Sequence, residues 1–238
     1  MNKTLDIRDS FVERVFATVA PRFDFLSRMF SLGLSAHWRR KALRLSGVGE
    51  GDRVLDICTG TGALAFLLAR MVGRRGSVVG VDFSRPMLDI AQKKKASLPD
   101  CDHLTFLYGD AKALDFPARS FDAVTVGFGM RNVRDTEAAL KEVRRVLRQG
   151  GRFVCLELTQ PPGRWVRRLY GSYVFRVIPV VSGLLLKDCT PYRYMARSIF
   201  GFSTPLEFRE VMESSGFRVE CMHIMLHGIA TIYVASVR

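Results

Sequence analysis

The chain has 238 residues, of which 48% are hydrophobic, so it is long enough and apolar enough to bury a core and is not a disordered protein. It has 36 lysines and arginines against 23 aspartates and glutamates, and the net charge of +13 favours an anionic partner such as nucleic acid or an acidic membrane face. The five cysteines are scattered with no CxxC pair, which argues against a disulfide framework or a metal site and favours a reducing cytosol.

Hydrophobic periodicity divides the chain into a helical beginning and an alternating remainder. Residues 8–45 show helical spacing, broken at Pro21 and Gly33, and from residue 53 apolar runs typical of buried strands alternate with amphipathic stretches. Gly150 and Gly151 are expected to end the helix that precedes the fifth strand. We expect strands at 53–57, 77–82, 104–108, 121–126, 152–158, 218–224 and 229–236, and helices at 61–71, 87–96, 137–148 and 205–216.

This alternation predicts an α/β fold, a doubly wound and mostly parallel sheet. We expect a single domain over residues 1–238, with a helical cap at 8–45 and an insertion at 159–203 that is opened by Pro161 and Pro162. The longest apolar run, residues 177–186, is about half of what a helix needs to cross a bilayer. The protein is therefore expected to lie in solution or on a membrane surface.

A glycine loop follows the first expected strand, in the sequence VLDICTGTG at 54–62. Gly60, Gly62 and the residues after them fit the dinucleotide fingerprint, and Asp82 lies 20 residues beyond Gly62, where a ribose-binding acid is expected. Asp56 argues against a dinucleotide, because a carboxylate would repel a pyrophosphate but attract an ammonium or sulfonium group. Asp110 follows the third strand, where an adenine amino group could be bound. These residues together favour S-adenosyl-L-methionine (SAM) over NAD.

Longer motifs then resemble a known family. VLDICTGTG, VVGVDFSRPML, GDAKALDFP and FDAVTVGFGMRNVRD are similar to the class I SAM-dependent methyltransferases. The narrower elements FGMRNV (128–133) and RYMARSI (193–199) resemble the ubiquinone/menaquinone biosynthesis C-methyltransferases, as does the stretch at 20–42. The resemblance covers roughly residues 20–238. It implies a seven-stranded, Rossmann-like sheet whose last strand is reversed.

The resemblance also implies which residues bind SAM. The loop of Gly60, Thr61 and Gly62 would hold its methionine end, with Asp56 near the amino group, and Asp82 would bind the ribose hydroxyls. The remaining residues expected to bind SAM are Met87, Asp110, Ala111 and Gly127. The chain departs from the family at Cys58 and Thr59, where small residues are usual, and at Phe23, where tyrosine is common.

The expected reaction is C-methylation of a demethylated quinol ring with a polyprenyl tail, either demethylmenaquinol or also the methoxy-polyprenyl-benzoquinol of ubiquinone synthesis. The enzyme would hold the ring near the methyl donor and stabilise a phenolate. Arg131 and Asn132 suit that catalytic task. His37, His223 or Asp24 could take the phenolic proton.

The insertion mixes arginines with aromatic residues in the sequence RWVRRLYGSYVFRV. It is expected to form a lid that faces both the prenylated substrate and an anionic membrane, so that the protein attaches peripherally to the cytoplasmic face. The same cluster could instead be a surface for a homodimer. The charge also suits an RNA methyltransferase, although the other motifs favour no nucleic acid partner. A non-catalytic scaffold of a quinone-assembly complex is a further alternative.

Overall fold

The structure is a computed structural model that describes residues 7–186 and 189–237. Residues 1–6 and 238, at the ends of the expected single domain, lie outside the described part. Residues 187–188, inside the expected insertion, also lie outside it.

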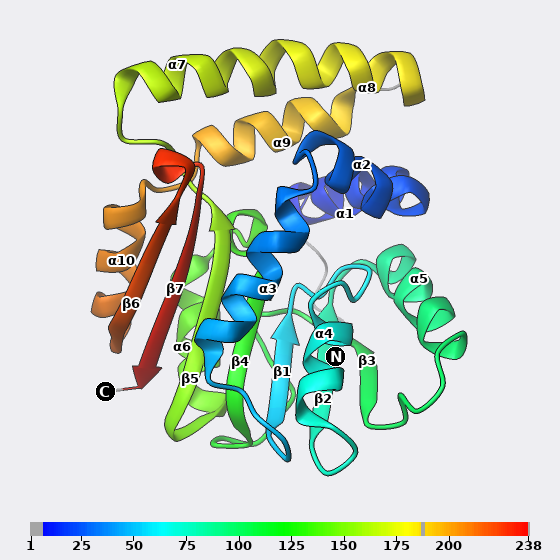
Figure 1. Ribbon diagram of the computed structural model, residues 1–238, viewed down its shortest axis with the longest axis vertical. Helices are drawn as coiled ribbons and strands as arrows, with labels where there is room; N and C mark the ends of the chain where they lie inside the picture. The colour runs from blue at the N-terminus through cyan, green and yellow to red at the C-terminus, as the bar shows by residue number, and fades with distance from the viewer. Residues whose placement is uncertain (1–6, 187–188, 238) are drawn as a thin grey trace.

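One seven-stranded sheet forms the centre of the molecule (Figure 1). Its strand order is β3-β2-β1-β4-β5-β7-β6, and β7 alone runs antiparallel to its neighbours β5 and β6. This confirms the expected sheet with a reversed last strand. The strands are β1 (Arg53–Ile57), β2 (Ser77–Asp82), β3 (Leu104–Tyr108), β4 (Phe121–Gly127), β5 (Leu147–Leu158), β6 (Phe217–Met225) and β7 (Ala230–Val237).

Helices cover both faces of the sheet, because alternate apolar residues of the central strands point to opposite sides. On β1, Val54 packs in a cluster with α4 and α5, whereas Leu55 and Ile57 pack in a cluster with α6 and α10. A fifth helix, α3, packs its Trp38 and Ala42 on β5 and β7. These helices are α3 (Leu34–Ser46), α4 (Ala65–Val72), α5 (Arg85–Ala96), α6 (Thr136–Val146) and α10 (Pro205–Ser214).

The boundary between α6 and β5 differs from the sequence prediction. The helix ends at Val146 and the strand begins at once with Leu147, which pairs with Phe121. Gly150 and Gly151 therefore lie inside β5, where the pairing register shifts, and the φ of +74° at Gly150 suits that irregularity. Leu147 is buried, as its place on the apolar stripe predicted, but it belongs to the strand.

A second layer lies over the carboxyl ends of the parallel strands (Figure 1). It joins the N-terminal cap to the insertion, whose apolar side chains share one buried cluster around Leu26, Val174, Tyr192 and Ile199. Pro21 and Gly33 mark the breaks in the cap, as expected. The layer contains α1 (Ile7–Val19), η1 (Ala20–Arg22), α2 (Phe23–Phe30), α7 (Arg164–Ser172), η3 (Tyr173–Val177), α8 (Ile178–Leu186) and α9 (Thr190–Phe200).

Candidate active site

A cavity of about 380 Å³ lies between the sheet edge and this second layer. It is placed where the strand order reverses between β1 and β4, which is where doubly wound sheets bind ligands. Every residue expected to bind SAM except Gly62 lines it, together with both expected catalytic residues. The expected residues along the cavity are Asp56, Gly60, Thr61, Asp82, Met87, Asp110, Ala111, Gly127, Arg131 and Asn132, while Gly62 completes the loop below.

Asp56 is held rigidly at the end of β1. Its two carboxylate oxygens accept hydrogen bonds from the hydroxyls of Thr59 and Thr125, both at 2.6 Å, and Thr125 is its register partner on β4. The side chain is buried, and burial raises its pKa to about 6 despite the two threonine hydrogen bonds. Asp56 therefore offers a fixed carboxylate at the cavity wall, ionised at neutral pH.

Asp82 ties the glycine loop to the end of β2. Its carboxylate accepts hydrogen bonds from the backbone N–H of Gly60 at 2.7 Å and of Ser84 at 2.8 Å. Burial again raises the pKa to about 6, opposed by those backbone hydrogen bonds. The acid thus fixes Ser84, the N-cap residue of α5, and lines the cavity at the same time.

Glycine is needed at the two positions of the loop for different physical reasons. Both adopt the left-handed region, with φ of +56° at Gly60 and +80° at Gly62. A Cβ on Gly60 would meet nothing within 4 Å, so its backbone is open to a ligand. A Cβ on Gly62 would lie 2.7 Å from the Phe106 ring, so this glycine lets the loop pack onto the core.

Cys58 explains one departure from the family pattern. Its φ of +51° is left-handed, a conformation in which glycine is unstrained, so the backbone conformation explains why the family favours a small residue at this position. Its Cβ would approach a Cβ on Gly129 to 2.3 Å, which explains the glycine of FGMRNV. Burial raises the pKa of the Cys58 thiol well above its ordinary value, so it is an inert wall residue.

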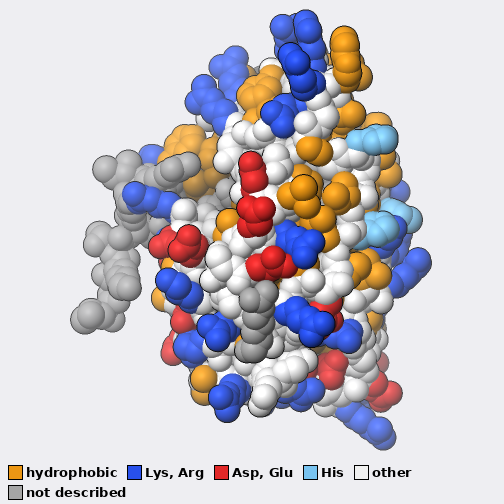
Figure 2. All heavy atoms as spheres, turned by 90° about the vertical axis from the view of Figure 1, so that its left-hand side faces the viewer, with side chains coloured by type: hydrophobic (Ala, Val, Ile, Leu, Met, Phe, Trp, Pro, Cys, Tyr) orange, Lys and Arg blue, Asp and Glu red, His pale blue; other side chains and the backbone are white. Residues whose placement is uncertain are grey.

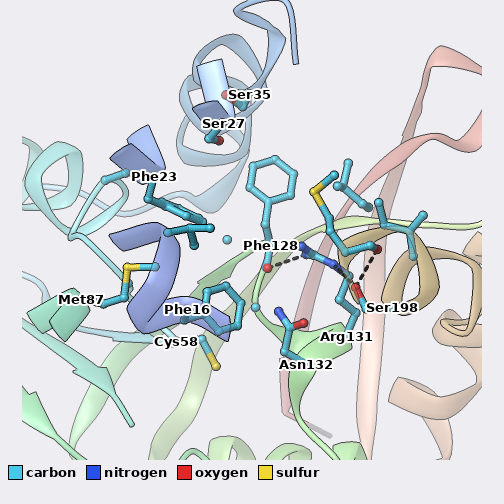
Figure 3. A pocket seen from close by; sticks show the side chains of 18 of the residues that line it. Phe16, Phe23, Ser27, Ser35, Cys58, Met87, Phe128, Arg131, Asn132 and Ser198 are labelled. Atoms are coloured by element: carbon cyan, nitrogen blue, oxygen red, sulfur yellow. Dashed lines mark hydrogen bonds between the residues drawn. The ribbon is translucent and has the colours of Figure 1, made fainter. Parts of the chain in front are cut away.

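Arg131 and Asn132 occupy η2 (Met130–Asn132), after β4, and face the cavity (Figure 3). The Arg131 guanidinium forms a buried ion pair with Glu157 at 2.6 Å and donates hydrogen bonds to the carbonyl of Phe128 and the hydroxyl of Ser198. The side chain of Asn132 accepts a hydrogen bond from the Tyr194 hydroxyl through its Oδ1. The charge of Arg131 is therefore balanced by Glu157.

The opposite side of the cavity is apolar. Phe16 and Phe23 from the cap and Met87 from α5 lie across from Arg131 and Ser198 (Figure 3). Phe23, the second departure from the family pattern, presents its ring to this wall without the hydroxyl that a tyrosine would carry. The cavity thus has a polar end at the strands and an apolar end under the cap and the insertion.

The expected proton acceptors lie away from this lining. His37 is exposed on α3, and His223 lies on β6 at the far side of the sheet order. Asp24 forms an ion pair with Lys94 and accepts a hydrogen bond from the Thr61 hydroxyl at 2.7 Å. No histidine lines the cavity within the part of the chain that the structure describes.

Sequence reasoning missed three contributors to the site. Glu157 pairs with Arg131, and its signal was an acid inside the apolar strand RFVCLEL. Lys94 joins α5 to the cap through Asp24 and also donates to the Thr61 carbonyl, although the lysine run reads as a solvated helix face. Arg39 lines the cavity from α3 with its guanidinium 5.2 Å from the centroid of the Phe128 ring.

These residues fit SAM better than a dinucleotide. The open backbone at Gly60 and the carboxylate of Asp56 suit a cationic amino-acid end. Asp82 and Asp110, at the ends of the next two strands of the sheet, suit a ribose and an adenine, respectively. A pyrophosphate would meet three acids here. Among the described residues, no group of three or more His, Cys, Asp or Glu side chains could hold a metal ion.

Comparison with known proteins decides the family. The model of the ubiE/COQ5 methyltransferase family matches residues 4–236. The chain belongs to this family. A ubiquinone/menaquinone biosynthesis C-methyltransferase UbiE of Geobacter sulfurreducens is 40% identical over 225 residues, covering 94% of this chain and 88% of that protein. A demethylmenaquinone methyltransferase of Staphylococcus aureus is 36% identical over 223 residues, covering 94% and 91%.

Solved structures agree with the ubiE/COQ5 fold. A SAM-dependent methyltransferase from Aquifex aeolicus superposes with a TM-score of 0.63 at 20% identity, covering 84% of this chain and 89% of that one. Another from Thermotoga maritima gives 0.64 at 19% identity, covering 95% and 100%. The protein is a SAM-dependent C-methyltransferase of the ubiE/COQ5 family, with the class I fold.

Proposed function

We propose that the enzyme methylates a ring carbon of a reduced, prenylated quinone precursor, with demethylmenaquinol as its main substrate and the benzoquinol of ubiquinone synthesis as an additional one. The observation that carries this proposal is the cavity itself. Its polar end holds the residues suited to SAM, and its other end is apolar and reaches the surface at Leu32 and Leu226. These two leucines line the cavity and are 82% and 47% exposed, so they mark where a long apolar tail could leave it.

When bound, SAM supplies a methyl group on a sulfonium. The chain supports transfer to carbon by holding the ring in line with that group and by excluding water from the apolar end. The Nδ2 of Asn132 donates to no described residue, so it is free to donate to a phenolate oxygen of the substrate. Arg131 is paired with Glu157 and makes the surroundings of that oxygen more polar. Its hydrogen bond to the Phe128 carbonyl also fixes the backbone between β4 and η2.

The test is methyl transfer from labelled SAM to reduced lipid extracts, one containing demethylmenaquinol and one containing the demethylated benzoquinol precursor. We expect label in the naphthoquinol product and a weaker signal in the benzoquinol product. The oxidised extracts are the control, because an oxidised ring has no phenolic proton to lose. Absence of label in both reduced extracts, from protein that still binds SAM, would overturn the quinol proposal and favour the scaffold alternative.

We also propose that the enzyme binds peripherally to the cytoplasmic face of an anionic membrane, where its substrate resides. The run from α7 to α8 has two faces. Tyr170, Tyr173 and Val174 line the cavity, while the opposite face exposes Trp165, Leu169, Val180 and Leu184 by 80%, 73%, 63% and 82%. No helix in the described part of the chain is both long and apolar enough to span a bilayer.

Charge supports the same orientation. Arg164, Arg168 and Arg176 are exposed on this helical run beside the apolar side chains. Figure 2 shows Lys and Arg side chains next to hydrophobic ones at the upper end of the molecule, the level at which α7 lies in Figure 1. Apolar residues that enter the acyl boundary with arginines at the head groups are typical of an interfacial helix.

Vesicle flotation tests this attachment. The protein should bind vesicles rich in anionic lipid and bind zwitterionic vesicles weakly, and the double substitution W165S/L169S should reduce binding about tenfold or more. Leu107→Ser is the matched control, because Leu107 is a 41% exposed leucine on β3, at the edge of the sheet opposite β6 and outside the run from α7 to α8. Unchanged binding by W165S/L169S would exclude this face. Loss of self-association by that variant in sedimentation would instead assign the face to a homodimer.

A further inference from the structure

Arg39 is an arginine of the cap whose role the proposed reaction leaves open. It lies on α3 and lines the cavity. Within residues 7–186 and 189–237, no oxygen accepts a hydrogen bond from its guanidinium, and its contact is the face of the Phe128 ring. Arg39 is half-buried, and its guanidinium nitrogens are not among the fully buried atoms without a partner, so its N–H donors are open to the cavity and to a ligand bound there.

The surroundings of Arg39 place it beside the glycine loop. Asp24 and Asp56 are the carboxylates that act on it electrostatically, yet neither is close enough to form an ion pair with it. Both carboxylate oxygens of Asp56 accept hydrogen bonds, from Thr59 and Thr125. Those of Asp24 accept hydrogen bonds from Lys94 and Thr61. The guanidinium therefore lies near two acids that are already hydrogen-bonded to other residues, and of these Asp56 lines the cavity with it.

Phe128 holds the guanidinium in a defined orientation. The ring contacts both Arg39 and Trp38, with its centroid 6.3 Å from that of the Trp38 ring, and the Phe128 backbone has a left-handed φ of +65°. That backbone is fixed on both sides, since its N–H donates to the Leu156 carbonyl and its carbonyl accepts from Arg131. A stacked guanidinium keeps its N–H edge free, and this edge matches the geometry of a carboxylate.

We propose that Arg39 binds the α-carboxylate of the methionine end of SAM, opposite Asp56, which takes the ammonium group. A zwitterionic amino acid needs one fixed anion and one fixed cation a few ångströms apart, and Asp56 and Arg39 are the pair of that kind at this end of the cavity. Arg39 comes from the cap and Asp56 from the sheet. The cap thus contributes directly to cofactor recognition, beyond covering the substrate.

Cofactor analogues test this proposal without the quinol, so its failure would leave the proposed methylation reaction standing. S-adenosylhomocysteine carries the carboxylate, and methylthioadenosine lacks the whole amino-acid end. In calorimetric titration, Arg39→Met should weaken S-adenosylhomocysteine binding roughly 10- to 100-fold and leave methylthioadenosine binding within about twofold. Arg39→Lys should recover part of the loss, because a lysine keeps the charge without the planar fork.

Arg40→Met is the matched control, because Arg40 is the next residue on α3 and is exposed. It should change neither affinity. Equal weakening of both ligands by Arg39→Met would overturn the proposal and assign Arg39 a structural role through Phe128. Unchanged binding of both ligands would also overturn it, and would release Arg39 for the substrate. Circular dichroism of each variant confirms that the comparison concerns folded protein.

Discussion

Two carboxylates at neighbouring strand ends, Asp56 and Asp82, carry the electrostatic character of the site. Both are buried, and both have a pKa raised to about 6 by that burial. The unfolded chain would titrate them near 4, so protonation favours the folded state. Their ionisation therefore costs stability as the pH rises from about 4 to about 6, and the cost is constant above that range.

Cofactor affinity should follow the same titration with the opposite sign. An ammonium group and ribose hydroxyls bind an ionised carboxylate better, so S-adenosylhomocysteine affinity should rise from about pH 5 to about pH 7 and then level off, by up to about tenfold per pH unit. Isothermal titration across this range measures it. Asp56→Asn should weaken binding and flatten the profile. A profile of the wild type that is already flat below pH 6 would contradict the prediction.

At the same scale, the buried pair of Arg131 and Glu157 is expected to be structurally essential. Arg131→Met leaves the Glu157 carboxylate, which is fully buried, without its partner, and should lower the free energy of unfolding by about 3–5 kcal/mol. The double variant R131M/E157Q should recover most of that loss, because no buried charge remains unpaired. Urea unfolding measures both.

The double variant also separates the two roles open to Arg131. If R131M/E157Q is stable and binds S-adenosylhomocysteine but transfers methyl groups at least about tenfold more slowly, Arg131 acts on the substrate. If it keeps its rate, Arg131 only positions the FGMRNV element. An Arg131→Met protein as stable as wild type would contradict the stability prediction.

At the scale of elements, a polar cluster bonds the cap to the glycine loop and to α5. Asp24 of α2 contacts Lys94 of α5 and the Thr61 hydroxyl, and Lys94 also donates to the Thr61 carbonyl at 3.1 Å. Helix α2 of the cap is thus bonded to the glycine loop that lines the cavity. Any motion that opens the cap must break these contacts, so cofactor binding and cap closure should be coupled.

Asp24→Asn tests this coupling. It should weaken S-adenosylhomocysteine binding by roughly fivefold and speed amide exchange over α1 and α2, since an amide forms a weaker bond to Lys94 than a carboxylate does. Asp100→Asn is the control, because Asp100 pairs with Arg74 on the surface, where both side chains are well exposed. Equal exchange rates in Asp24→Asn and wild type would show that the cap is held by its apolar contacts alone.

At the scale of the whole molecule, a net charge of +13 sits on a fold whose cavity is lined by acids and aromatic residues. We expect RNA to bind only through this general charge, with affinity that falls steeply between about 50 and 200 mM salt, and to receive no methyl group. Filter binding and labelled-methyl transfer to total RNA measure the two parts. Salt-resistant RNA binding with transfer of label would support the nucleic acid alternative.

Much of the fold is readable from the sequence. The bounds of β1, β2 and β3 are predicted to the residue, because each is a short apolar run bounded by polar or glycine-containing turns, although β3 is the edge strand and is half exposed. The glycine loop and the acids at 56, 82 and 110 are also predicted, since motif spacing fixes their place at the strand ends. The end of α6 is wrong in the prediction because Leu147 satisfies a helical stripe and a buried strand equally well.

The sequence by itself determined the α/β class, the identity of the cofactor and the positions of the residues that lie at the ends of consecutive strands. These depend on local periodicity and on short spacings along the chain. Only the tertiary structure decided which distant side chains meet. Arg131 pairs with Glu157, 26 positions away, and Lys94 with Asp24, 70 positions away. Arg39 meets Phe128 from a different element altogether. Such pairings depend on how the cap and the sheet pack together, which no local pattern of residues encodes.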